Sequence, residues 1–325
     1  VRGRHHIASF VDRAVKEKGV LFLWKKTLPV MQHANILVAN LEGPIAAGVN
    51  QRGCYQPGRS PWDLRLYTGY PLFNYPPALA EALSQSHVSL ATTANNHALD
   101  RYSLGINKTI TILHRHGVVP LGTKSSKRLK SPWYRLTDSH GVRIAWIACT
   151  TGINGMKDRH HQVLRCYQSW GRRTILSLVK RLRHRVDAVI VLPHWGRQYQ
   201  FIPDAAQQRF AHQVLNAGAL MVIGTHPHVL QPFRLFRTRD HRNTFVAYSL
   251  GNFVSYQGSV KNRTSVILFV SLAKHHGRTL ISRIAYQPVF MRNRSGMGRI
   301  QLTLLQSKRK HPASWRILRH TLGQR

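Results

Sequence analysis

Four apolar runs of strand character in this chain are each followed at once by turn-forming polar residues. The runs span residues 36–39, 88–94, 188–192 and 219–223, and segments with helical spacing of apolar residues lie between them. Short apolar runs that end in turn residues are typical of buried strands, and their alternation with helices predicts an α/β sheet. Because ligand sites in such sheets collect at the carboxyl ends of strands, we expect these distant segments to meet in space.

Side chains with nitrogen and oxygen ligands follow these runs and one later strand. They occur in five short segments: Asn40-Leu41-Glu42, Asn95-Asn96-His97, His194-Trp195-Gly196, Gly224-Thr225-His226-Pro227-His228 and Leu250-Gly251-Asn252. His226 and His228 can both face one cation, because the proline between them fixes the backbone and the preceding glycine allows a sharp exit from the strand. Neutral imidazole binds zinc, manganese, iron or nickel well. The pattern therefore predicts a metal-centred site.

Each of the other candidate residues has a role in such a site and a structural alternative. His194 is a further ligand or a structural histidine, and the Asn96 carbonyl is a ligand or part of a turn. His97, if not itself bound to metal, can protonate a leaving group or stabilise developing negative charge. Glu42 can ligate a metal or act as a base toward metal-bound water, or it can cap the following segment. Trp195 could form a wall of the site.

Several other mechanisms and sites lack their sequence signatures. The chain has no Gly-x-Ser-x-Gly elbow, no phosphate-binding glycine loop ending in Lys-Ser or Lys-Thr, and no dinucleotide fingerprint after a strand. A paired-carboxylate mechanism would need a partner for Glu42, and Asp100 is the only other acidic residue close to a motif. Cys54, Cys149 and Cys166 lack metal-site or redox spacing; they allow one disulfide, but we expect Cys149 to be a small buried residue.

The charge balance predicts attraction to polyanions. The 48 lysines and arginines outnumber the 11 acidic residues and give a net charge of +37. Nucleic acid, anionic lipid headgroups and acidic polymers are the candidate partners. Basic residues are dispersed, with concentrations at 124–130, 172–185 and 308–319, and no zinc-finger, RNA-binding or basic heptad motif occurs. A specific anionic partner and a general compositional bias both stay open.

The length of 325 residues and the pattern of apolar runs predict one large α/β unit with an extended loop. Residues 48–77, rich in Gly, Pro and aromatics, are expected to form an ordered loop over a site.

No run approaches the roughly 20 apolar residues of a membrane-spanning helix. The other expected elements are helices at 11–18, 23–31, 77–84, 103–116, 174–182 and 205–217, a strand at 142–149, antiparallel strands of a second sheet at 245–248, 265–272, 280–286 and 299–305, and a peripheral basic tail at 307–325.

The motifs together resemble those of a known family. Residues 39–44 (Ala-Asn-Leu-Glu-Gly-Pro), 94–100, 193–196, 224–232 and 248–254 resemble, in order and approximate spacing, the CapA family of bacterial capsule and poly-γ-glutamate biosynthesis proteins. The resemblance covers about residues 7–290. It implies a four-layer α/β/β/α sandwich of the metallo-dependent phosphatase type, which we expect to form a single domain over residues 1–306.

The resemblance also implies roles for individual residues. Carried over by motif, the metal-facing residues would be Glu42, Asn96, His194, His226 and His228, around a divalent ion such as Mn, Zn, Fe or Mg. His97 would be the acid or charge-stabilising partner, with Glu42 a second catalytic candidate. We expect substrate contacts from Asn40, Asn95, Trp195 and Asn252.

Two functions follow from the resemblance. One is a metal-dependent hydrolase of the bacterial cell envelope that acts on a phosphoester or amide of an anionic polymer such as poly-γ-glutamate. The other is a non-catalytic scaffold with a degenerate metal site, whose charge holds the polymer, an anionic membrane surface or other capsule-synthesis subunits. Nucleic-acid binding is supported by charge alone, and we expect it to be nonspecific.

Three departures from the family pattern bear on the metal centre. No Gly-Asp precedes Asn40, so either a segment upstream of Val1 carries that ligand or this member lacks it. Gln198 stands where family members tend to carry Glu, and Arg101 where an aromatic residue is usual. These departures favour a one-metal centre over a two-metal centre.

Overall fold

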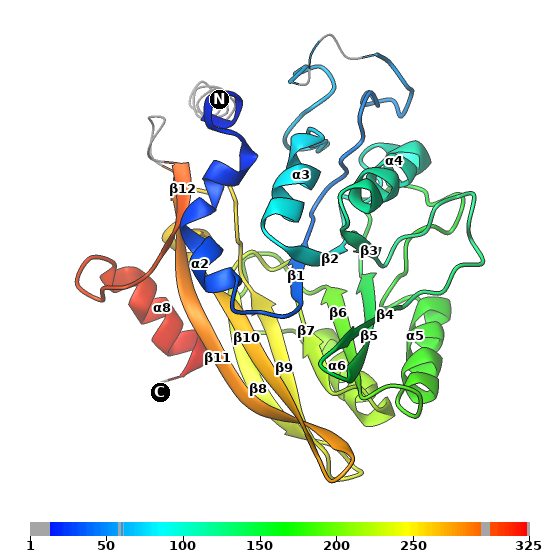
Figure 1. Cartoon of the computed structure of the whole chain (residues 1–325), viewed down its shortest axis with the longest axis vertical. Coiled ribbons are helices and arrows are strands. Elements are labelled where there is room, and N and C mark those ends of the chain that lie inside the picture. Colours follow the sequence, from blue (N-terminus) through cyan, green and yellow to red (C-terminus); the bar gives the residue numbers. More distant parts are fainter. Residues whose placement is uncertain (1–13, 58–59, 61, 294–299, 324–325) are drawn as a thin grey trace.

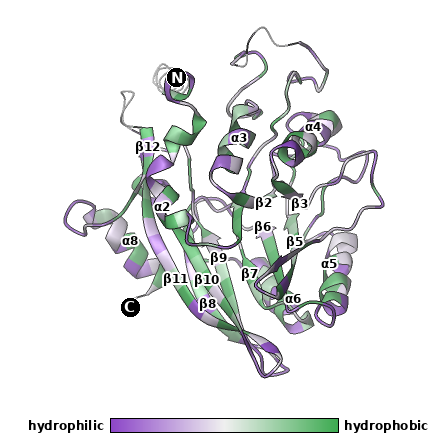
Figure 2. Ribbon diagram, in the orientation of Figure 1, coloured by the Kyte–Doolittle hydropathy of each residue, from purple (hydrophilic) through white to green (hydrophobic). Residues whose placement is uncertain are grey.

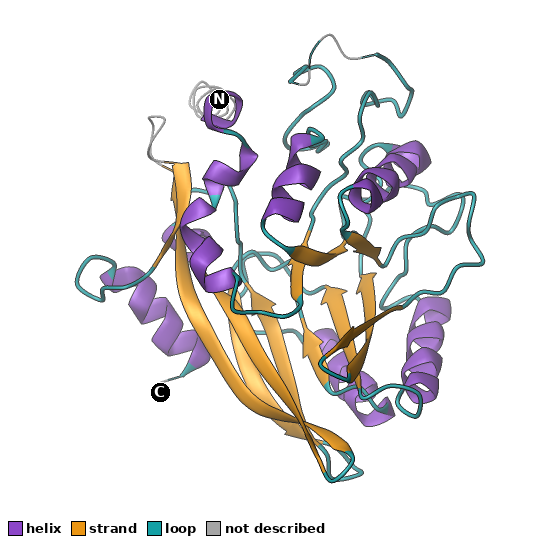
Figure 3. Ribbon diagram, in the orientation of Figure 1, coloured by secondary structure: helices purple, strands orange, loops and turns teal. Residues whose placement is uncertain are grey.

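The computed structural model describes residues 14–57, 60, 62–293 and 300–323, and the strands within them form three sheets (Figures 1 and 3). The largest sheet has the strand order β4-β5-β6-β7-β9-β8. Its four central strands are parallel, and both edge strands run antiparallel to their neighbours. The bounds are β4 Arg135–Ser139, β5 Val142–Thr150, β6 Ala188–His194, β7 Met221–Ile223, β8 Leu230–Arg237 and β9 Asn243–Leu250.

The two smaller sheets have three strands each. One is parallel, with β1 Leu37–Asn40, β2 Val88–Thr92 and β3 Val119–Leu121. The other is antiparallel, with β10 Thr264–His275, β11 Arg278–Asn293 and β12 Ile300–Leu304. The longer helices are α3 Ala78–Gln85, α4 Tyr102–Arg115, α5 Ser169–Leu182, α6 Ala205–Ala217 and α8 Pro312–Leu322.

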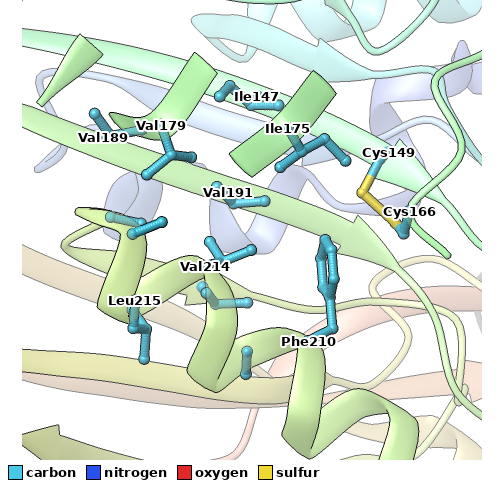
Figure 4. Close-up of a cluster of buried hydrophobic side chains, with 14 of the residues drawn as sticks. Ile147, Cys149, Cys166, Ile175, Val179, Val189, Val191, Phe210, Val214 and Leu215 are labelled. Atoms are coloured by element: carbon cyan, nitrogen blue, oxygen red, sulfur yellow. A yellow bond between two sulfur atoms is a disulfide. The ribbon is translucent and has the colours of Figure 1, made fainter. Parts of the chain in front are cut away.

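Helices α5 and α6 cover one face of the six-stranded sheet. Figure 4 shows Ile147 and Val191 of the sheet beside Ile175 of α5 and Val214 of α6, all buried in one apolar cluster. On the other face, Trp146 and Ile190 belong to a second cluster together with Leu90 of β2. Side chains of β10 and β11 pack against this same cluster. The two three-stranded sheets therefore form the second β layer together.

The second β layer is covered in turn by its own helices. Leu83 of α3 and Leu113 of α4 are buried with Ala91 of β2. Met31 of α2 (Leu28–Met31) is buried with Leu302 of β12. Figure 2 shows hydrophobic residues concentrated in these central strands and on the covered faces of the helices. The expected α/β/β/α sandwich is confirmed, because burial of apolar area on both faces of each sheet needs a helical layer outside it.

The second sheet differs from its prediction in one strand. Residues 245–248 belong to β9, which pairs with β7 in parallel and so completes the six-stranded sheet. The predicted strands at 265–272, 280–286 and 299–305 do lie in the antiparallel sheet, as parts of β10, β11 and β12; Arg299 itself is outside the described residues. β3, β4 and β8 were not predicted. β8 contains Pro232 and two arginines, Arg234 and Arg237, as an edge strand tolerates.

The two ends of the chain differ in part from their predictions. Of the helix expected at 11–18, residues 14–18 are helical and 11–13 lie outside the described residues. The helix expected at 23–31 is divided into η1 Val20–Leu23, η2 Lys25–Thr27 and α2. In the basic segment expected to be peripheral, α8 buries Leu318 in a cluster with Leu230 and Phe290. The segment is thus attached to the fold through its apolar face.

A disulfide closes the segment that follows β5. Cys149 is buried, as expected, but its sulfur is bonded to that of Cys166, and the two residues are 17 positions apart (Figure 4). The expectation that Cys149 acts only as a small buried residue is therefore wrong, because the sequence does not show that residue 166 returns beside β5. Cys54 is an exposed free thiol. Among the described residues, no helix combines the length and apolar character needed to cross a membrane.

Gly171 offers a test of how α5 packs against this closed segment. A Cβ at Gly171 would lie 1.9 Å from the backbone carbonyl oxygen of Arg165. Alanine normally stabilises a helix relative to glycine by about 1 kcal/mol. Here we expect Gly171→Ala to lower the free energy of unfolding by about 1–3 kcal/mol, because overpacking outweighs helix propensity.

Urea unfolding monitored by circular dichroism measures this difference. Ser177→Ala, at an exposed position of the same helix, is the matched control and should change stability by less than about 0.5 kcal/mol. An increase in stability for Gly171→Ala would show that α5 is not packed as described.

Candidate metal centre

The five predicted segments all follow the carboxyl ends of strands. These strands are β1 and β2 of the small parallel sheet and β6, β7 and β9 of the large sheet. The site therefore lies where the two β layers meet. The contact between the layers is made directly by His194 Nε2, which lies 2.8 Å from Asn96 Oδ1.

His194 Nε2 is the centre of a cluster of ligand atoms. His226 Nδ1 lies 3.0 Å from it, and Glu42 Oε1 lies 3.6 Å from it. The same Glu42 oxygen lies 3.7 Å from His228 Nε2. One ligand atom each from Glu42, His194 and His226 lies within 4.8 Å of the others. All five residues predicted to face a metal are thus linked by these contacts.

The donor set fits a divalent cation. His194 Nε2 can donate at most one hydrogen, yet it faces an amide oxygen, an imidazole nitrogen and a carboxylate oxygen at once. A cation satisfies such converging lone pairs together. Imidazole nitrogens combined with carboxylate and amide oxygens suit borderline ions such as zinc, manganese or iron. This agreement between chemistry and geometry supports the predicted divalent metal, whose identity the donor set leaves open.

Neighbouring polar groups orient the ligands. Asn252 donates from Nδ2 to the carbonyl oxygen of Asn262 at 2.9 Å, which leaves its Oδ1 to accept from His228 Nδ1 at 2.9 Å. The proton is thereby fixed on Nδ1, and the Nε2 lone pair of His228 faces Glu42. Asn40 Nδ2 donates to Glu42 Oε2 at 3.2 Å. Asn40 and Asn252, predicted as substrate contacts, thus both orient ligand side chains.

Trp195 and Asn95 are buried, contrary to their predicted role as substrate contacts. Trp195 is 0% exposed, and its indole nitrogen donates to the carbonyl oxygen of Tyr248. Asn95 is also 0% exposed, and its Nδ2 donates to the carbonyl oxygen of Leu41. Both side chains satisfy buried backbone groups instead of facing a cavity, which explains why polar or aromatic residues stand there.

The backbone around the two histidines needs special residues. Gly224 must lack a side chain, because a Cβ there would lie 2.2 Å from both Trp195 Nε1 and the Tyr248 carbonyl oxygen. Beyond it, His226 and His228 have positive φ angles of 99° and 60°. Such angles are costly for residues with a Cβ, and at functional sites they persist when surrounding contacts enforce them.

A histidine–aspartate pair lies beside the ligand cluster. His97 Nδ1 lies 2.7 Å from Asp100 Oδ2, and both side chains are buried. Asn154 links this pair to the ligands, since its Oδ1 accepts from Asn96 Nδ2 at 3.1 Å and its Nδ2 lies 3.4 Å from His97 Nδ1. Asn154 was missed by sequence reasoning. The sequence signal for it is the Asn-Gly turn at 154–155, which follows shortly after the strand at 142–149.

The loop at 48–77 contacts the site, as expected. The backbone N–H of Phe73 donates to Asp100 Oδ2 at 2.7 Å, and the Phe73 ring packs edge-on against His97. The Tyr75 hydroxyl donates to the Glu42 carbonyl oxygen at 3.0 Å. Phe73 therefore contacts the His97–Asp100 pair, and Tyr75 contacts the backbone of Glu42.

Arg101, which departs from the family pattern, holds this loop in place. Its side chain is 0% exposed, and its guanidinium donates to the carbonyl oxygens of Val49, Leu66 and Leu72 and to the Thr68 hydroxyl. Burial lowers the pKa of Arg101 from its usual value, with Asp100 acting in the opposite direction. The guanidinium of Arg101 thus holds the loop through hydrogen bonds to its backbone.

Burial and mutual repulsion keep His194 and His226 neutral. Burial, followed by the charges of His226 and His228, holds the pKa of His194 well below its usual value. Burial, followed by His228 and His97, lowers the pKa of His226 to about 4. Burial also raises the pKa of Glu42, an effect opposed by His228, His97 and the hydrogen bond from Asn40. Neutral imidazoles at neutral pH are the form that binds metal.

Comparison with known proteins identifies the family. The family model described as "Bacterial capsule synthesis protein PGA_cap" matches residues 3–257. The chain belongs to this family. All five ligand-bearing segments lie within the matched residues, so the resemblance seen in the motifs is confirmed.

Two characterised relatives carry related names. The chain is 24% identical over 268 residues to the "PGA biosynthesis protein CapA" of Bacillus subtilis (strain 168), and this alignment covers 82% of the chain and 65% of the relative. It is 24% identical over 275 residues to the "Capsule biosynthesis protein CapA" of Bacillus anthracis, covering 82% of the chain and 60% of the relative. The chain therefore spans less than two thirds of the length of either relative.

The fold is also found in a solved structure. The NAD nucleotidase NadN of Haemophilus influenzae aligns with a TM-score of 0.51 and 14% identity, over 93% of this chain and 56% of that protein. At this level of identity the likeness concerns the fold alone. It agrees with the α/β/β/α sandwich described above.

Removal of the Arg101 guanidinium should release the loop. We expect Arg101→Leu to lower the free energy of unfolding by about 3 kcal/mol, because it leaves several buried carbonyl oxygens without donors. Chymotrypsin should then cut within 48–77 faster than in the unaltered chain. Arg52→Leu, an exposed change in the same loop, is the control and should leave both properties unchanged. Equal proteolysis of the two variants would contradict this role of Arg101.

The lowered pKa of His226 predicts acid sensitivity of the metal-free protein. Between pH 6.5 and pH 4 the unfolded chain binds a proton that folded His226 does not, so this group lowers stability as the pH falls through that window. From pH 7 to pH 5 the loss is about 2 kcal/mol. Urea midpoints measured in chelator should fall less over this range for His226→Gln than for the unaltered chain. Parallel pH profiles would show that His226 is not held neutral.

Proposed function

We propose that this chain is a divalent-metal-dependent hydrolase-like protein of capsule or poly-γ-glutamate synthesis that acts on an anionic polymer or its precursor. The observation that carries the proposal is the convergence of Glu42, Asn96, His194, His226 and His228 beside the His97–Asp100 pair. A bound divalent ion at these ligands would supply Lewis-acid polarisation of a substrate oxygen.

The His97–Asp100 pair would move the proton. With Nδ1–H donating to the buried carboxylate of Asp100, the Nε2 atom of His97 is the one able to exchange a proton with substrate. Asp100 would stabilise the imidazolium form of His97 when it carries the second proton. The Phe73 ring and the backbone of the 48–77 loop limit water around the pair. Leaving-group protonation by His97 fits either a phosphoester or an amide.

The family and the charge together support an anionic polymer as substrate. The relatives are named for capsule and PGA biosynthesis. A net charge of +37 attracts a polyanion over distances of about a Debye length, near 10 Å in moderate salt. Other capsule-synthesis subunits and an anionic membrane surface are further partners that this charge suits.

The disulfide supports an envelope location. Cys149 and Cys166 are both 0% exposed and bonded to each other. Such bonds form and persist in oxidising compartments and are rare in the reducing cytosol. The bacterial cell envelope is therefore the compartment we propose.

A second candidate is a scaffold whose metal site is degenerate. It is favoured by the net charge of +37, which attracts a polyanion without any chemistry. Within the described residues, one set of three His, Cys, Asp or Glu side chains has its ligand atoms clustered, and it consists of Glu42, His194 and His226. A scaffold would hold polymer by charge without changing it.

Measurement of bound metal tests the metal centre independently of any catalytic activity. We expect the purified chain, after dialysis, to retain about one Mn or Zn ion, and the double variant His226→Ala with His228→Ala to lose at least tenfold in affinity. His184→Ala, at an exposed position on the protein surface, is the control and should bind metal normally. Equal metal content in the double variant and the unaltered chain would overturn the proposed centre.

Turnover decides between the two candidates. We expect His97→Ala to keep its metal while hydrolysis of γ-linked glutamate oligomers or of a phosphodiester falls by about 10²–10⁴-fold. Chain length of the oligomer by mass spectrometry and release of chromophore from the diester are the two readouts. A metal-loaded chain that changes neither compound in long incubations is the scaffold.

A further inference from the structure

A second hollow lies away from the metal ligands, between α7 (Val260–Arg263), the β11–β12 pair and the start of α8. Its volume is about 950 Å³, within the range of ligand-binding pockets. None of its lining residues belongs to the metal centre. They are Lys26, Val260, Arg263, Phe290, Arg292, Thr303, Leu304, Gln306, Lys310, His311, Pro312, Ala313 and Ser314. We call this space the α7–α8 hollow.

The α7–α8 hollow is lined by positive groups. Lys26, Arg263, Arg292 and Lys310 come from four different parts of the chain, and no aspartate or glutamate is among the lining residues of this described region. Burial lowers the pKa of His311, and the charges of Arg292, Arg263 and Lys310 lower it further. The hollow is therefore lined by several positive charges close to one another, as expected for a site that binds an anion.

An apolar floor lies beneath these charges. Phe290 is buried, and the Arg263 guanidinium carbon lies 4.7 Å from the centre of its ring. The His311 ring packs on the same Phe290 at 4.9 Å between centroids. Stacking on an aromatic face holds a guanidinium in a defined place at little further entropic cost. Val260 and Leu304 extend the apolar surface.

A cationic rim above an apolar floor favours anions that also carry apolar groups. A polycarboxylate with methylene groups between its amides and its carboxylates can lay the methylenes on Val260 and Leu304 while arginine and lysine bind the carboxylates. The volume exceeds the space that a single phosphate needs, so several residues of a chain would fit. A phosphate polymer offers the charges but no methylene groups for the floor.

We propose that the α7–α8 hollow binds a segment of an acidic polycarboxylate chain. This inference rests on the proposed function for the identity of the polymer. It adds a binding place for the polymer that is distinct from the metal ligands.

Helix α7 connects the hollow with the metal centre. Val260 and Arg263 line the hollow, while Asn262 of the same turn donates from Nδ2 to the His228 carbonyl oxygen at 3.3 Å. The Asn262 carbonyl oxygen accepts from Asn252, the residue that orients His228. A polymer segment held in the hollow would therefore lie against the helix that supports one metal ligand.

Charge reversal within the hollow tests the proposal. Binding of a fluorescent γ-linked glutamate oligomer is measured by anisotropy in chelator, so that metal plays no part. We expect Arg292→Glu with Lys310→Glu to weaken binding at least tenfold. The control, Arg309→Glu with Arg319→Glu, makes the same change in net charge at exposed positions outside the hollow and should weaken binding less than threefold. Equal losses in the two double variants would overturn the proposal.

Further measurements identify the class of ligand and distinguish polymer binding in the hollow from metal binding. Arg292→Gln with Lys310→Gln, a milder change, should weaken binding with an unaltered thermal midpoint, which excludes unfolding as the cause. Polyphosphate and single-stranded DNA of matched charge should bind more weakly than the oligomer; stronger binding that the same variants abolish would overturn the assignment to polycarboxylate. The double variant His226→Ala with His228→Ala should bind the oligomer normally. Loss of metal binding and loss of polymer binding are therefore independent results.

Discussion

The contact between His194 and Asn96 joins the two β layers, and the rest of the site depends on it. His194 ends β6 in the large sheet, and Asn96 follows β2 in the small parallel sheet, 98 positions away in the chain. The apolar cluster between the layers brings these strand ends together. Glu42 then approaches from β1 and His226 from β7, because each follows a strand packed in one of the same two layers. The site is thus a product of layer packing more than of any local motif.

Basic residues far outnumber acidic residues in this chain, and the two kinds of residue lie at different candidate sites. Glu42 and Asp100 are two of only 11 acidic residues, and both lie at the site. Glu42 faces His194 and His228, while Asp100 pairs with His97. The positive excess elsewhere lines the α7–α8 hollow and much of the surface. Two carboxyl groups therefore lie where a cation would bind, and positive groups lie where an anion would bind.

Much of the fold could be predicted from the sequence because local signals agree with tertiary structure. α6 was predicted at its observed bounds, 205–217, where Asp204 and Gln207 form a capping box and Gly218 follows the helix. β3 could not be predicted, since a three-residue strand containing Pro120 has no periodic pattern. The ligand residues were visible as polar side chains after apolar runs, whereas the burial of Trp195 and Asn95 depends on partners, Tyr248 and Leu41, that only the fold brings near.

The bond between Cys149 and Cys166 makes residues 150–165 a closed loop, and Asn154 lies within it. Asn154 is the residue that joins Asn96 to the neighbourhood of His97. The disulfide thus restrains the segment that contains Asn154. In a reducing compartment this restraint would be absent, and the position of Asn154 between Asn96 and His97 would depend on its noncovalent contacts.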